Sequence, residues 1–167
     1  MKSRFIYRVM VHSKTLINAL ALSPHPEGGF YKEIYKSPQS FGERSLCTTI
    51  LYLLTRESHI GHLHKNVSDI THYFHWGNPI RYTTISPEGR LDNFILGPRF
   101  DQGEYFQKTV MGEYWKASEL QGGNCDFALI SESVSPGFSW DEMELASKEM
   151  FKNLFPRLLS EVSHLIL

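Results

Sequence analysis

Two histidines separated by a single residue, His62 and His64, carry the clearest chemical signal in the chain. Side chains two positions apart on a β-strand point to the same side of the strand, so both imidazoles can reach one ligand or one cation. Imidazole gains and loses a proton near neutral pH, which suits general acid–base catalysis. We therefore predict His64 and His62 as the catalytic pair.

The next expected strand begins six residues further on and has two faces of different polarity. One face carries Ile70, His72, Phe74 and Trp76, and the other carries Asp69, Thr71, Tyr73 and His75. The more apolar face should turn to the interior, because a strand buries one set of alternating residues. We expect His72 inside, near His62 and His64, and Asp69 outside. These three imidazoles form a candidate site for a divalent metal ion, Zn, Ni, Fe or Mn.

The elements that must position these residues are short strands. Turn signals between apolar, β-branched runs recur every ~8–12 residues, which is typical of an all-β sandwich or barrel. The predicted strands are 30–36, 48–55, 70–75, 81–86, 91–96, 105–110, 114–117 and 125–133. A helix capped by Ser13 is expected over 13–22, and two short helices on either side of Pro156 are expected near the C-terminus. The glycines of the loop His25–Gly29 can take positive φ.

Composition narrows the classes of function. The chain has 167 residues, enough for one domain, and a formal net charge of −1, which provides no electrostatic footprint for nucleic acid. No apolar run approaches the ~18 residues that a membrane span needs. Residues 1–11 lack the apolar core of a signal peptide, and two cysteines do not make a disulfide scaffold. We therefore expect a cytoplasmic protein with neither nucleic-acid nor membrane partners.

Five blocks in order resemble one known family. They are Leu22–Ser37 with its HPEGG signature, Arg44–Leu54, Gly89–Gly97, Val110–Ser118 and Ser133–Leu145. The chain is similar to the uncharacterised cupin family with this signature, cupin family 5. The resemblance implies an all-β, single-domain, jelly-roll-type (double-stranded β-helix) barrel over residues 13–167, with short flanking helices and an N-terminal extension at 1–12. It also implies a homodimer, in which the strand Phe30–Ser37 pairs with or is exchanged with the partner.

The chain departs from the cupin motifs at two metal-ligand positions. The family's spacing puts Ile70 where the first motif has its glutamate, and Lys116 where the second motif has its histidine. The missing ligands favour a site without a cofactor over one that holds a metal through His62, His64 and His72.

The remaining site residues come from the HPEGG loop for Glu27, from strand parity for His72 and from the family alignment for Gln107 and Trp115. Glu27, His72, Gln107 and Trp115 are predicted to bind the ligand; the alternatives are a backbone cap for Glu27 and a core position for Trp115. Phe138 and Trp140 are expected to pack the C-terminal helices onto the barrel. We expect the pocket to bind a small polar molecule, such as a sugar derivative, and to act as an acid–base isomerase or epimerase. A metal-dependent enzyme and a non-catalytic binding protein are the alternatives.

Overall fold

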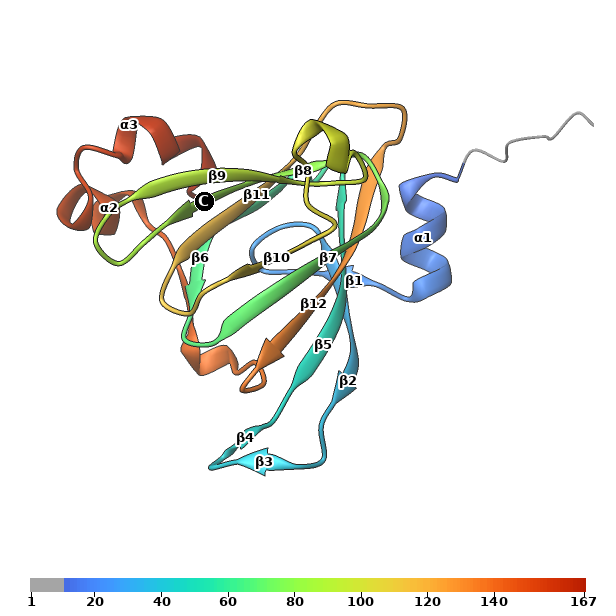
Figure 1. Cartoon of the computed structure of the whole chain (residues 1–167), viewed down its shortest axis with the longest axis horizontal. Coiled ribbons are helices and arrows are strands. Elements are labelled where there is room, and N and C mark those ends of the chain that lie inside the picture. Colours follow the sequence, from blue (N-terminus) through green and yellow to red (C-terminus); the bar gives the residue numbers. More distant parts are fainter. Residues whose placement is uncertain (1–10) are drawn as a thin grey trace, which may run out of the picture.

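Two antiparallel β-sheets face each other, and short helices cover their outer faces (Figure 1). The computed structural model describes residues 11–167. Within this range, the six-stranded sheet runs in the order β1 (Ser23–Pro24), β2 (Phe30–Lys36), β5 (Thr48–Thr55), β12 (Phe127–Ser135), β7 (Asp69–Gly77) and β10 (Gln107–Val110). The five-stranded sheet runs β13 (Met143–Leu145), β6 (Ile60–Asn66), β11 (Trp115–Leu120), β8 (Ile80–Ile85) and β9 (Leu91–Leu96). This is the expected all-β jelly roll.

Three helices, three 3₁₀ turns and a small hairpin complete the described part of the chain. The helices are α1 (Ser13–Leu20), α2 (Lys148–Leu154) and α3 (Leu159–Val162), the turns are η1 (Phe100–Gln102), η2 (Trp140–Glu142) and η3 (Ser163–Leu165), and the hairpin is β3 (Ser40–Phe41) with β4 (Arg44–Ser45). None of the helices in residues 11–167 is long and apolar enough to cross a membrane.

Both sheets bury residues on both of their faces. Tyr52, Tyr82 and Ile130 pack in the core between the sheets. On the outer side of the six-stranded sheet, Leu53 and Phe127 pack against α1. On the outer side of the five-stranded sheet, a second cluster joins the C-terminal helices to the strands; its members include Leu63, Ile85, Trp115, Phe151 and Leu165. Apolar character therefore does not identify the inner face of a strand in this fold.

Most predicted elements are confirmed, with small shifts of their ends. The strands at 48–55 and 91–96 match β5 and β9, and Pro156 separates α2 from α3. The first helix is shorter than expected, because Ala21 adopts a left-handed φ of 53°. His12, and not Ser13, is its N-cap residue, since the Ser13 amide and hydroxyl bind Asp126. The expected N-terminal extension comprises residues 1–12. Residues 1–10 of it lie outside the described residues.

The loop His25–Gly29 lies against β6, and two glycines allow this close approach. Gly28 has a φ of 104°, and a Cβ atom on it would lie 2.2 Å from the Ile60 carbonyl oxygen. The amide of His62 donates to the Glu27 carbonyl (2.6 Å), and the Tyr52 hydroxyl donates to the Gly28 carbonyl (2.8 Å). The expectation that Gly28 and Gly29 serve backbone shape is confirmed, and their conformation holds Glu27 at the inner face of the five-stranded sheet.

Candidate functional site

A β-bulge separates the two histidines that the spacing predicts to act together. In the ladder between β6 and β11, Lys116 pairs with His64 but Ser118 pairs with Gly61, so the register shifts within the segment that holds His62. His64 faces the interior, whereas Nδ1 of His62 lies 3.2 Å from the Leu165 carbonyl oxygen on the side of the C-terminal helices. The expected convergence of His62 with His64 and His72 is wrong, because the extra residue in the bulge reverses the alternation.

His64 forms a buried pair with Glu27. Nε2 of His64 lies 2.9 Å from Oε2 of Glu27, and Nδ1 lies 2.7 Å from the His62 carbonyl oxygen. Burial alone would raise the pKa of Glu27, but the nearby His64, His25 and Lys116 outweigh it and lower this pKa to about 2. The carboxylate is therefore ionised at neutral pH. Both ring nitrogens of His64 therefore face oxygen atoms of the protein.

A second histidine–carboxylate pair comes from the facing sheet. His72 on β7 is fully buried, and its Nδ1 lies 3.1 Å from Oε1 of Glu132 on β12 and 3.1 Å from the Tyr82 hydroxyl. Burial raises the pKa of Glu132, but the charge and hydrogen bond of His72 outweigh it, so the net shift is downward. The prediction that His72 faces the interior is confirmed. Asp69 lies outside as expected, and it accepts a hydrogen bond from the Gly112 amide (2.7 Å).

Lys116 adds a buried cation beside these pairs. It lies opposite His64 in the ladder, so both side chains leave the same face of the five-stranded sheet, and only 3% of it is exposed. Burial lowers the pKa of Lys116, while Glu27 and Glu132 offset part of this effect. An ammonium group thus stands at the position where the second cupin motif has a histidine.

A cavity of about 250 Å³ opens between the sheets beside both pairs. Glu27, His64 and Glu132 lie in its polar wall, with Ile50, Ile70 and Val134 among the apolar lining. His25, Tyr31, Phe138 and Trp140 form an aromatic cluster at one side; the His25 and Trp140 rings are 5.5 Å apart, and those of Phe138 and Trp140 are 4.8 Å apart. Trp140 remains 49% exposed. The cavity therefore combines acid–base groups with exposed aromatic faces.

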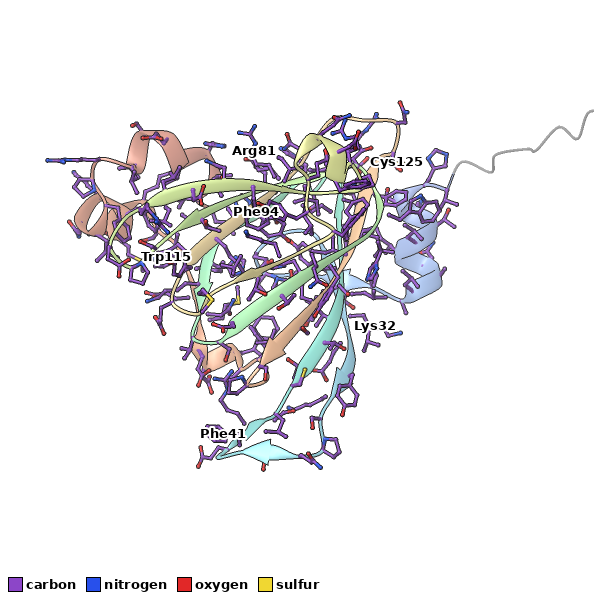
Figure 2. All side chains as sticks on the ribbon, viewed as in Figure 1. Lys32, Phe41, Arg81, Phe94, Trp115 and Cys125 are labelled. Carbon is purple, nitrogen blue, oxygen red and sulfur yellow. The ribbon has the colours of Figure 1, made fainter. Side chains whose placement is uncertain are left out.

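The aromatic residues exchange the roles that the sequence predicts for them. Trp115 lies on the outer face of β11, where its ring is 5.1 Å from that of Phe151 on α2 (Figure 2). It is the core tryptophan that packs the C-terminal helices, whereas Phe138 and Trp140 line the cavity. Gln107 is exposed and pairs with Tyr73 on the outer face of the sheet. Trp115 and Gln107 are thus outside the cavity, and the neighbouring residues Lys116 and Lys108 face inward.

The residues present do not fit the metal site that the cupin motif implies. Within residues 11–167, no group of three or more His, Cys, Asp or Glu side chains is arranged to hold a metal ion. His62 lies on the other side of β6, and the rings of His64 and His72 each face a separate carboxylate. The side chains are directed toward one another, and they do not present lone pairs to one shared point.

Two facing antiparallel sheets with a cavity between them are the double-sheet jelly-roll architecture of the cupins. The model of the family described as Cupin superfamily (DUF985) matches residues 14–146, and the chain belongs to this family. An uncharacterised protein of Saccharomyces cerevisiae is 35% identical over 170 residues, which covers 90% of this chain and 84% of the yeast protein.

Three solved structures are similar to this chain, two of them closely in both sequence and structure and the third in its fold alone. A protein of Shewanella oneidensis has a TM-score of 0.88 at 33% identity, over 95% of this chain and 99% of that one. A hypothetical protein from Leishmania major has a TM-score of 0.87 at 30% identity, over 93% and 99%. Oxalate decarboxylase from Bacillus subtilis has a TM-score of 0.55 at 15% identity, over 85% of this chain and 36% of that one, and this likeness concerns the fold alone.

Proposed function

We propose that this cupin binds a small polar molecule in the cavity and transfers protons on it, as an isomerase or epimerase does. The observation that carries the proposal is the Glu27–His64 contact of 2.9 Å in a cavity that also contains Glu132. Paired titratable groups in a concave, partly apolar site are the usual setting of acid–base catalysis.

The two pairs can take opposite roles. The His64–Glu27 pair, which lines the cavity and joins Nε2 of His64 to Oε2 of Glu27, is the proton donor, while Glu132, whose pKa is lowered, is the proton acceptor. They belong to facing sheets, so a ligand between them meets a base on one side and an acid on the other. Glu132 takes a proton from a carbon next to a carbonyl group of the ligand, and the electron pair of the broken C–H bond is held as the enolate. The His64–Glu27 pair then returns a proton to the opposite side of the same carbon, so that a new C–H bond forms and the carbonyl group is restored. This sequence inverts the carbon without oxidation or reduction.

Incorporation of deuterium from solvent tests proton transfer even while the substrate is unidentified. The purified protein is incubated in D₂O with a small-molecule extract, and mass spectrometry records which compounds gain one mass unit from non-exchangeable positions. We expect at least one compound to be labelled by the wild type, and labelling to be lost in His64→Gln and in Glu132→Gln. His59→Gln and Glu57→Gln are matched controls, because both residues lie outside the cavity lining. Absence of labelling with the wild type, or equal labelling by His64→Gln, would refute catalysis and leave a binding protein.

We further propose that two copies associate through the edge of β2. β1 pairs only with Phe30 and Tyr31, so the rest of this edge strand has no neighbour on that side within the described residues. The hairpin beyond it extends away from the sheets, with Phe41 at its tip (Figure 2). Tyr35 is 50% and Phe41 70% exposed. An open edge with exposed apolar side chains favours pairing with a second copy of this chain.

A cytoplasmic location is part of the same proposal. The free thiols of Cys47 and Cys125 support it, because unpaired cysteines are typical of a reducing compartment.

A further inference from the structure

Three glutamates in the lining of the cavity determine which charged groups a ligand meets there. Glu27 and Glu132 lie in the wall, and Glu33, which is exposed, joins them at the mouth. Among the described residues that line the cavity there is no lysine or arginine. A ligand inside it therefore meets carboxylate oxygens, which accept hydrogen bonds and donate none while ionised.

Two basic side chains close to the cavity are withdrawn from its lining. Lys116 is 3% exposed and does not belong to the lining residues. Arg44 lies 2.6 Å from Glu142 and donates further hydrogen bonds to the Gly137 carbonyl and the Ser68 hydroxyl. A phosphate or carboxylate group would thus approach carboxylates without the arginine or lysine partners that normally hold it.

Each carboxylate of the wall already has a partner behind it. Glu27 is paired with His64, Glu132 is paired with His72, and Lys116 attracts both. A cationic ligand consequently finds no unpaired anion deep in the cavity. Hydroxyl groups, which can donate to a carboxylate and accept from the side-chain amide of Asn66 in the lining, fit this wall without a charge of their own.

The aromatic cluster and the size of the cavity complete the ligand's description. Trp140 is half-exposed beside Tyr31, with 6.2 Å between the ring centroids. An exposed indole face suits the C–H face of a ring, and about 250 Å³ is a space for one small ring. We infer that the cavity binds an uncharged, hydroxyl-bearing single ring, of the monosaccharide type, and discriminates against its phosphorylated counterpart. This inference rests on the proposed function and specifies its substrate class.

Matched probes that differ in one group test this class. Ligand-observed NMR titrations use D-glucose, D-glucosamine and D-glucose 6-phosphate, with the corresponding galactose and mannose sets to cover stereochemistry. We expect at least one neutral sugar to bind roughly tenfold or more tightly than its phosphate, because the charged phosphate gives up water on entering a cavity whose lining offers it no lysine or arginine. The amino sugar should bind no more tightly than the neutral one. Phosphate binding as tight as neutral binding, tenfold tighter amine binding, or no binding by any neutral sugar would each overturn the inference.

Two variants locate the binding and separate this inference from the proposed function. Trp140→Ala should weaken the neutral sugar several-fold, whereas Trp76→Ala should not, because Trp76 is similarly exposed but packs against Phe127 outside the cavity. Unchanged binding by Trp140→Ala would overturn the assignment of the aromatic face. If the phosphate binds and Glu27→Gln changes its affinity, the substrate class is wrong but the cavity is still the binding site. Deuterium incorporation decides the proposed function independently of either result.

Discussion

Replacing Glu27 by glutamine removes one charge from the buried pair with His64 while it preserves the volume of the side chain. The pKa of Glu27 falls from 4.5 to about 2 on folding, and burial leaves this side chain only 6% exposed. Each pKa unit corresponds to about 1.4 kcal/mol, so the ionised carboxylate contributes on the order of 3 kcal/mol to the free energy of unfolding at neutral pH. That magnitude is a large part of the stability of a typical domain.

The sign of the pH dependence follows from the direction of the pKa change. The folded pKa lies below the unfolded pKa, so the stabilisation is fully present above about pH 4.5 and is lost as the pH falls toward about 2. Glu27→Gln should therefore be about 3 kcal/mol less stable than the wild type at pH 7, and this difference should shrink below pH 4.5. The free energy of unfolding should also change less steeply with pH in that range, because the variant takes up as much as one proton fewer on unfolding than the wild type does.

Urea unfolding at pH 7 and at several values between pH 5 and pH 3 measures both effects. Glu33→Gln is the matched control, because Glu33 belongs to the same cavity but is exposed, and we expect it to change stability by less than about 0.5 kcal/mol. If Glu27→Gln behaved like Glu33→Gln in stability and slope, the Glu27–His64 pair would not contribute in the way that its geometry implies.

Two further predictions concern the loop and the assembly. Gly28→Ala should be less stable than Gly42→Ala by about 1–3 kcal/mol. Both glycines have positive φ, but only at Gly28 would a Cβ atom meet the backbone, 2.2 Å from the Ile60 carbonyl oxygen, and equal thermal midpoints of the two variants would contradict this. Light scattering of the full chain should give the mass of a dimer, and Phe41→Ser should shift it toward the monomer; a monomeric wild type at micromolar concentration would exclude the proposed association.

The periodicity of the sequence was sufficient to predict most of the strands and helices, and to predict which face of β7 points inward. The alternation in β7 is unbroken from Ile70 to Phe74, and the assignment of His72 to the interior is confirmed there. It failed in β6, because a bulge leaves no mark in the alternation of His62 and His64. It failed for Trp115 because helices cover the outer face of the sheet, so that the larger apolar residue belongs outside and Lys116 inside.

Glu132 was missed although the sequence contains a signal for it. Ala128, Ile130 and Val134 alternate on the inner face of β12, and Glu132 is the one acidic residue in that series. A carboxylate in an otherwise buried apolar face is costly unless it has a partner, and such a residue is a candidate for function. Its partner, His72, lies 60 positions earlier in the chain, and only the pairing of β12 with β7 brings the two together.

The substitution of Lys116 for the motif histidine alters what this cavity can hold. A metal centre needs several lone pairs directed at one point, and a lysine ammonium offers none. In this chain Glu27 lies within hydrogen-bond distance of His64, Glu132 lies within hydrogen-bond distance of His72, and Lys116 is close to both carboxylates. Each carboxylate has its own histidine partner, and the groups lie at a cavity rather than within a sealed core. The fold thereby keeps the pocket of a cupin with titratable side chains in place of metal ligands, and this arrangement supports the proposed acid–base chemistry.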